Sequence, residues 1–306
     1  MKTRALAAPA LLAVAALGLA GCASTSSDSA AGADSGTVTV VASTDVYGSI
    51  AEAIGGDAVT VTSVIDDPDK DPHEYEADAR TQLSLSKADI VIENGGGYDD
   101  FMDTMLKSAD NSDAVVLNAA DISGYDQEPA EGEFNEHMWY DYPTVGKVAE
   151  QFAAAVEKAD PDAADTVKEN LATFQKGLDE LTADVDTLKG TAEGQSVAIT
   201  EPVPLYLLDA AGFSNATPDE FSESIEEGTD APVRVMQETL ALFSEKKVAL
   251  LVYNEQTDGP QTEQVLAAAK DAGIPAVGVT ETLPKGEDYL SWQTSVIEQI
   301  SSALGA

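Results

Sequence analysis

The chain has only two histidines in 306 residues, and these are its best candidates for metal chemistry. His73 lies in the stretch Asp-Pro-His-Glu, and His137 lies in Asn-Glu-His-Met-Trp. Imidazole is the commonest protein ligand for borderline transition metals, and it binds them as the neutral ring. If the protein binds such a metal through nitrogen, it must use these two residues. We hypothesise that they lie on one wall of a cleft and that carboxylates from a second lobe complete the site.

Two glutamates occupy suitable positions for those carboxylates. Glu201 follows the predicted strand 196–200, and Glu281 follows the predicted strand 274–279. Two neutral imidazoles and two carboxylates carry a charge of -2, which balances a divalent ion in a buried cleft where an unpaired charge is costly. Carboxylate oxygens favour Mn²⁺, whereas imidazoles keep Zn²⁺ and Fe²⁺ open. We therefore expect one Zn²⁺ or Mn²⁺ per chain, and no catalytic residue.

Each of these four residues also has a simpler interpretation. His73, beside a proline in an acidic loop, is compatible with an ordinary surface histidine. His137 precedes Met, Trp and Tyr, and could cap an aromatic cluster. A single glutamate such as Glu201 or Glu281 proves little among 55 acidic residues.

The elements that must position these residues alternate between strands and helices. Runs of β-branched residues predict strands at 37–43, 59–65, 89–93 and 114–117, with helices at 44–55, 81–88 and 98–108 between them. Such alternation is typical of parallel βαβ units, whose ligands bind beyond the carboxyl ends of the strands. The glycines at 95–97 lack a nucleotide-binding signature, so we expect a tight turn there.

The second half repeats this pattern after a long amphipathic helix. Apolar residues spaced by three and four from Val167 to Leu188 predict one helix between two α/β halves. Predicted strands at 196–200, 247–253 and 274–279 alternate with helices at 202–211, 234–244, 261–272 and 289–303. The predicted fold is α/β, with two lobes of mainly parallel sheet joined by one long helix and the metal site in the cleft between them. We expect an N-terminal lobe at 37–143, connecting helices at 144–189 and a C-terminal lobe at 190–306.

The net charge of -39 argues against one class of partner. So acidic a surface repels the phosphates of nucleic acids, so we expect no nucleic acid binding.

The N-terminus has the pattern of a lipoprotein signal peptide. Lys2 and Arg4 precede an apolar stretch that ends in Leu-Ala-Gly-Cys22, which resembles the bacterial lipobox. That resemblance implies cleavage before Cys22 and lipidation of this residue, which is the only cysteine of the chain. We expect residues 1–22 to be the signal peptide and 23–36 a flexible tether. An ordinary secretory signal is the simpler alternative.

Several motifs in order resemble those of the solute-binding lipoproteins of zinc and manganese ABC transporters. They are DPHEYE at 71–76, ADIV with NG at 88–91 and 94–95, NEHMWYD at 135–141, TEP with YLL at 200–202 and 206–208, and VTETLP at 279–284. The resemblance implies that His73, His137, Glu201 and Glu281 bind the metal. It also implies a bacterial protein, lipid-anchored on the outer face of the cell membrane, that passes the ion to an ABC permease and its ATPase. We expect it to act as a monomer.

Two departures from the family bear on the choice of ion. The chain lacks the histidine- and acid-rich loop of many zinc members, and it has Glu201 where some members have histidine. Both features favour Mn²⁺, although some glutamate-bearing members are described as zinc binders.

Two other classes of function remain open from the residues. A metallohydrolase could use the histidines and one carboxylate, but the chain has no His-Glu-x-x-His motif. A binding lipoprotein for an organic solute would need aromatic faces and arginine clamps, and the chain has 6% aromatic residues.

Overall fold

The computed structural model describes residues 36–67, 75, 78–130 and 132–305. Two of the residues singled out above, Cys22 and His73, lie outside the described residues. Thr37–Ala306 forms one unit by its internal contacts.

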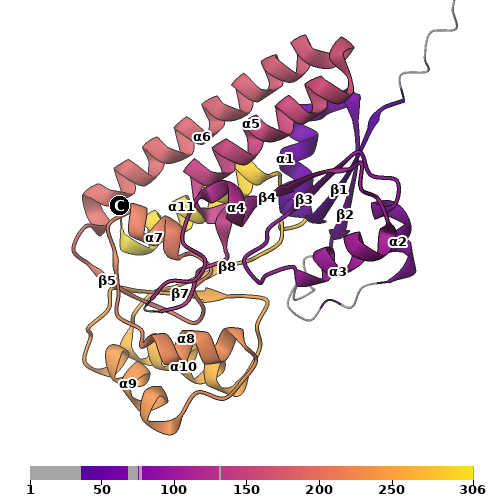
Figure 1. Ribbon diagram of the computed structural model, residues 1–306. Helices are drawn as coiled ribbons and strands as arrows, with labels where there is room; N and C mark the ends of the chain where they lie inside the picture. Colours follow the sequence, from indigo (N-terminus) through magenta and orange to yellow (C-terminus); the bar gives the residue numbers. More distant parts are fainter. Residues whose placement is uncertain (1–35, 68–74, 76–77, 131, 306) are drawn as a thin grey trace, which may run out of the picture. The chain divides into compact units, whose positions relative to one another are not determined.

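The first half of the chain forms a four-stranded parallel sheet with the order β2-β1-β3-β4 (Figure 1). Its strands are β1 (Val38–Thr44), β2 (Val59–Ile65), β3 (Ile90–Glu93) and β4 (Val115–Asn118). Its helices are α1 (Asp45–Gly55), α2 (Ala79–Leu85), α3 (Asp100–Ala109) and α4 (Ala119–Ser123), with a 3-10 turn, η1 (Gly56–Ala58). Strands β1 and β3 are almost wholly buried, as expected for a parallel sheet with helices on its faces.

The second half repeats this topology with the order β6-β5-β7-β8, again all parallel. Its strands are β5 (Ser196–Ile199), β6 (Ser214–Asn215), β7 (Leu250–Asn254) and β8 (Ala276–Val279). Its helices are α7 (Leu205–Ala210), α8 (Asp219–Glu226), α9 (Val233–Ser244), α10 (Pro260–Ala272) and α11 (Tyr289–Leu304). In each sheet the second strand of the chain pairs with one side of the first strand, and the third strand pairs with its other side. This order places a topological switch point between β1 and β3 and another between β5 and β7.

Two long helices connect the sheets, α5 (Tyr142–Ala159) and the 29-residue α6 (Ala164–Ala192), and they run side by side (Figure 1). The short turns η3 (Met138–Tyr140) and η4 (Pro161–Ala163) precede them. Of the apolar stripe predicted for α6, Leu171 is partly buried and the other six residues are buried. Each such buried side chain contributes roughly 1.5–3 kcal/mol, so this stripe fixes the helix to the body of the protein.

The main hydrophobic core is continuous across both halves. It joins Val40 and Ile92 of the first sheet to Ile199 and Val252 of the second, through the helices α1, α5, α6 and α11. Smaller clusters lie under α2 and α3 and under α8, α9 and α10. The predicted fold class, α/β with two parallel sheets and one long helix, is confirmed.

Some element boundaries differ from the sequence-based expectation. Helix α4 forms at Ala119–Ser123, where no helix was predicted, and α6 runs from Ala164 to Ala192, beyond both ends of the predicted stripe from Val167 to Leu188. No element was predicted for residues 212–233, where the structure forms β6 and α8. Only Phe221 and Ile225 give α8 an apolar spacing of four, which is too short a pattern to identify a helix. Among the described residues, no helix combines the length and apolarity that a membrane span requires.

Candidate metal centre

The second sheet brings three polar side chains to the carboxyl ends of its strands. Glu201 follows β5 after one intervening residue, Asn254 ends β7, and Glu281 lies two residues beyond β8. Since β5 and β7 flank the switch point of this sheet, Glu201 and Asn254 occupy the position where open α/β sheets bind ligands. All three are almost completely buried, with 2%, 2% and 1% of their surface exposed respectively.

Asn254 joins the two glutamates. Its Nδ2 donates to Glu201 Oε2 at 2.6 Å and to Glu281 Oε1 at 2.7 Å. Its Oδ1 accepts the backbone N–H of Gln256 at 3.0 Å, which orients the amide with its nitrogen toward the carboxylates. Hydrogen bonds to ionised acceptors are the stronger kind, so Asn254 holds two like-charged side chains at one place. The predicted strand 247–253 ended before Asn254, and the sequence did not reveal this role.

Gln256 fixes the turn that carries Glu281. Its Oε1 accepts the backbone N–H of Glu281 at 2.6 Å, and its Nε2 donates to Thr282 Oγ1 at 2.9 Å. The end of β7 and the loop after it therefore position both carboxylates: Asn254 bonds both side chains, and Gln256 bonds the backbone of Glu281.

His137 comes from the first half of the chain, directly before η3, and is fully buried. Its Nδ1 lies 2.7 Å from Asn135 Oδ1. Asn135 Nδ2 donates to the carbonyl of Pro202, so its Oδ1 faces the imidazole, and an amide oxygen can only accept. Nδ1 therefore carries the hydrogen, and Nε2 is the nitrogen with metal-ligand character. A hydrogen bond of this kind on the second ring nitrogen is usual for metal-binding histidines.

Carboxylates face Nε2 of His137 from two directions. Glu281 Oε2 lies 4.0 Å from it and Glu226 Oε1 lies 3.5 Å from it. Two ligand atoms about 2.1 Å from one tetrahedral ion lie roughly 3.4 Å apart. A closure of roughly half an ångström would therefore bring His137 and Glu281 to ligand spacing. Within the described ranges, which leave out His73, no three side chains of His, Cys, Asp or Glu already form a metal-holding group.

Glu226 is the site residue that the sequence did not reveal. It is the last residue of α8, and its side chain has 16% of its surface exposed. Nothing in its neighbourhood in the sequence, which runs Ser-Ile-Glu-Glu-Gly, distinguishes it from the other acidic residues. Its approach to His137 depends on how α8 packs against the second sheet, and that is a tertiary property.

Tyr98 completes the described surroundings of the histidine. Its ring lies 6.1 Å from the His137 ring and 4.8 Å from the Trp139 ring, centroid to centroid. Burial raises the pKa of Tyr98 well above its ordinary value, and the nearby Glu281 carboxylate, to which the hydroxyl hydrogen-bonds, raises it further. Tyr98 therefore stays neutral and acts as a hydrogen-bond donor.

The structure thus brings together three of the four predicted ligands, His137, Glu201 and Glu281, and it adds Glu226 and Asn254 to them. The fourth, His73, lies outside the described residues and stays a prediction.

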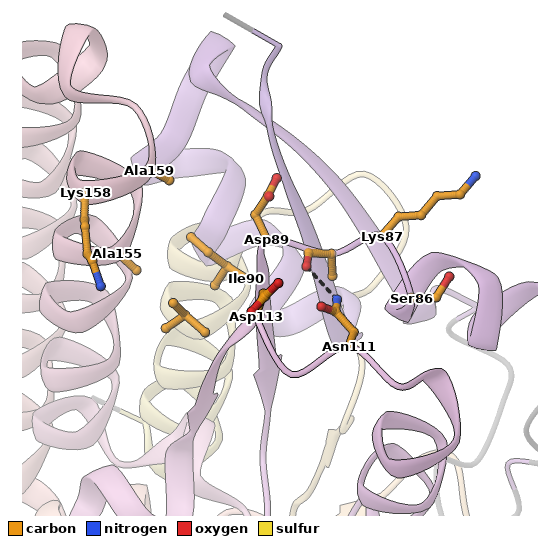
Figure 2. A pocket seen from close by; sticks show the side chains of 11 residues that line it. Ser86, Lys87, Asp89, Ile90, Asn111, Asp113, Ala155, Lys158 and Ala159 are labelled. Atoms are coloured by element: carbon orange, nitrogen blue, oxygen red, sulfur yellow. Dashed lines mark hydrogen bonds between the residues drawn. The ribbon is translucent and has the colours of Figure 1, made fainter.

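A cavity of about 360 Å³ lies at the amino ends of the strands of the first sheet and is separate from the candidate metal centre (Figure 2). It lies against Ile90 and Val115, at the amino ends of β3 and β4. Figure 2 shows Lys87 extending away from it, while Asn111 donates to the Ala88 carbonyl at 2.8 Å. Ligands of parallel sheets bind at the opposite ends of the strands.

Comparison with known families supports the motifs read from the sequence. Residues 40–303 match the family described as "ZnuA: Zinc-uptake complex component A periplasmic". The chain belongs to this family. The resemblance predicted from the spaced motifs is therefore confirmed.

Curated relatives of this ZnuA-family chain are named for metal binding or metal transport. It is 25% identical to the manganese ABC transporter substrate-binding lipoprotein ScaA of Streptococcus gordonii, over 96% of this chain and 97% of the relative. It is 27% identical to the manganese-binding lipoprotein MntA of Bacillus subtilis, over 83% and 82%. These relatives are described as binding proteins rather than as enzymes.

Solved structures of the family share the fold. The periplasmic zinc-binding protein TroA of Treponema pallidum superposes with a TM-score of 0.74 at 20% identity, covering 88% of this chain and 99% of TroA. A crystal structure of ZnuA gives a TM-score of 0.71 at 20% identity, with 88% and 99% covered.

Proposed function

We propose that this protein captures a divalent transition-metal ion outside the cytoplasmic membrane and delivers it to an ABC transporter permease driven by its ATPase. The carrying observation is the buried His137, whose Nε2 faces Glu281 at 4.0 Å while Asn135 holds its other nitrogen. Family membership supports the same function, because relatives at 25–27% identity are named as metal ABC transporter lipoproteins or manganese-binding lipoproteins.

The proposed ligands are His73, His137, Glu201 and Glu281, with one ion per chain. Four protein ligands suit capture rather than hydrolysis, because hydrolytic sites keep a coordination position open for water. Glu226 increases the negative charge around the ion.

The proposed ion is Mn²⁺ or Zn²⁺. The oxygen-rich donor set favours the harder Mn²⁺, whereas raw affinity at the same ligands favours Zn²⁺ over Mn²⁺. Manganese relatives and zinc-named structures both stand among the similar proteins. Direct competition between the two ions at one site would decide between them.

We also propose that the chain is a monomer anchored by a lipid on Cys22, after cleavage before Cys22 has removed residues 1–21. Stable anchoring to a membrane needs more than one acyl chain, and the lipoprotein modification of a cysteine supplies more than one. A Cys22→Ser variant should leave the membrane fraction of a bacterial host, whereas the wild-type chain should stay in it. Equal release of both would contradict the anchor without affecting the metal site.

The central experiment measures metal content and competition on the full chain, purified in detergent without chelator. We expect one tightly held Mn²⁺ or Zn²⁺ per wild-type chain. The variants His73→Ala, His137→Ala and Glu281→Ala should each lose it. Glu227→Ala is the matched control, since Glu227 is exposed and adjacent to Glu226.

Two results would contradict this proposal. If the wild-type protein takes up neither ion, the alternative function, binding of an organic solute, would be favoured. Metal retained by both His137→Ala and Glu281→Ala would show that the ion binds elsewhere.

A further inference from the structure

A second acidic pocket lies at the carboxyl ends of β3 and β4, apart from the centre described above. Its volume is about 450 Å³. Six carboxylate side chains line it, those of Glu93, Asp99, Asp100, Asp103, Asp121 and Glu128. Of the described residues that line it, none is a lysine, arginine or histidine. Lys107, which pairs with Asp103 at 3.2 Å, does not line the pocket.

Glu93 distinguishes this pocket from an ordinary acidic surface. It is the last residue of β3, and only 5% of it is exposed. Its Oε1 accepts from Asn118 Nδ2 at 2.9 Å, from the residue paired with it in β4. Its Oε2 is buried and has no hydrogen-bond partner among the described residues. A buried carboxylate oxygen without a donor is costly.

Protonation and the binding of a cation are the two ways to lower this cost. The pKa of Glu93 is raised to about 7, mainly by burial and in smaller part by the carboxylates of Asp99, Asp103 and Asp121, against the lowering effect of the Asn118 hydrogen bond. A protonated Glu93 would bring an O–H group to Oε2, and that group would need an acceptor. A cation in the pocket would give Oε2 a partner once the Glu93 side chain turned toward it, and it would also reduce the repulsion among the neighbouring carboxylates.

The loop after β3 is shaped around the pocket. Gly95, Gly96 and Gly97 have positive φ angles of 73°, 70° and 103°. A side chain on Gly95 would collide with Asn118, at 2.3 Å, so this glycine lets the loop close over the residue that holds Glu93. The same loop is fixed by Asp99, whose Oδ1 and Oδ2 accept the N–H groups of Gly95 and Asn94 at 2.7 and 2.6 Å.

We propose that this pocket is a second cation site, selective for Ca²⁺ and independent of the transported metal. All of its candidate ligands are oxygen atoms, which suits hard cations rather than Zn²⁺. Ca²⁺ accepts six to eight oxygens in an irregular arrangement, and the octahedral geometry that Mg²⁺ demands is stricter. Glu93 is the buried ligand at the base of the site, and the exposed Asp100, Asp103, Asp121 and Glu128 supply further oxygens or hold its waters.

The test is equilibrium dialysis of the full chain in detergent against Ca²⁺, after removal of metal by a chelator. We expect one saturable Ca²⁺ per chain with a Kd of roughly 10⁻⁵–10⁻³ M. Glu93→Gln and Asp121→Asn should each weaken it at least about tenfold, because the charge count at the site sets its affinity. Asp113→Asn, an exposed aspartate at the other end of the sheet, and Glu281→Gln, in the transport centre, should bind as wild type does.

Three results would overturn the proposal: Ca²⁺ binding unchanged by Glu93→Gln, Ca²⁺ binding lost in Glu281→Gln, or displacement of Ca²⁺ by an equal concentration of Mg²⁺. Thermal unfolding in the presence of a chelator serves as the control that the variants are folded. There Glu93→Gln should melt no lower than wild type, since glutamine keeps an acceptor for Asn118 and removes the buried charge. A lower melting temperature would be a fourth result against the proposal, because it would show that the Glu93 carboxylate stabilises the fold without a cation.

Discussion

Replacing Asn254 by alanine removes the amide that joins Glu201 to Glu281. The wild-type amide makes hydrogen bonds of 2.6 and 2.7 Å to the two carboxylates, which are 2% and 1% exposed. A hydrogen bond to a charged group contributes about 1.5–3 kcal/mol. The two lost hydrogen bonds set an upper bound of about 3–6 kcal/mol on the loss of stability. We expect the free energy of unfolding of the metal-free protein to fall by about 2–4 kcal/mol.

The same substitution should weaken metal binding. Outer partners of metal ligands typically change affinity by about 10–100-fold when removed, which corresponds to about 1.4–2.8 kcal/mol. The assay is competition with a fluorescent chelator, for Mn²⁺ and Zn²⁺ separately, beside denaturant unfolding with chelator present.

Asn111→Ala is the matched control for Asn254→Ala. Asn111 also donates two hydrogen bonds, each of 2.8 Å, but to the carbonyls of Leu85 and Ala88 at the far end of the first sheet. It should lose stability and keep wild-type metal affinity. If Asn254→Ala loses stability but binds both ions as Asn111→Ala does, the idea that Asn254 organises the ligands is wrong.

Three further variants test separate parts of the site. Glu226→Gln should weaken metal affinity by about tenfold through the loss of one nearby charge. The adjacent Glu227→Gln should not change the affinity. Equal affinities of the two variants in calorimetric titration would show that Glu226 does not belong to the site. Asn135→Ala should weaken metal affinity by about tenfold or more and increase its dependence on pH, because the metal-facing imidazole loses the partner that fixes its tautomer; an unchanged pH profile would contradict this. Asp45 has a pKa raised to about 6, mainly by burial, so the folded protein keeps a proton that the unfolded chain loses. Stability should therefore fall by about 1–2 kcal/mol as the pH rises from about 4 to 7, and Asp45→Asn, but not the exposed Asp57→Asn, should reduce that fall in urea unfolding curves.

The sequence predicted the scaffold well because its signals are local. Buried parallel strands appear as β-branched runs, and the stripe on α6 spans six turns. Glu201 and Glu281 could be proposed because the residue after a predicted strand has a known position in an open α/β sheet.

The remaining site residues depend on contacts between distant segments. Asn254 meets carboxylates 53 and 27 residues away, and its role follows from which way its amide points. Glu226 ends a helix whose sequence pattern is only two apolar residues long. Glu93 ends a predicted strand like many others, and its burial results from its pairing with Asn118 in β4.

The hydrogen bonds around Glu281 also limit how the ion can leave. Tyr140 donates to the carbonyl of Thr280 at 3.0 Å, and the N–H of Leu283 donates to Asp45 Oδ1 at 3.1 Å. The turn that carries Glu281 is thus bonded on both sides to residues of the first half of the chain, the half that also contains His137. Wide separation of the sheets would break both bonds, in addition to the packing of α6 along the continuous core. Because Asn254 also bonds both carboxylates, these contacts favour release by a small movement that lengthens the distances between the ligands and the ion without separating the two sheets.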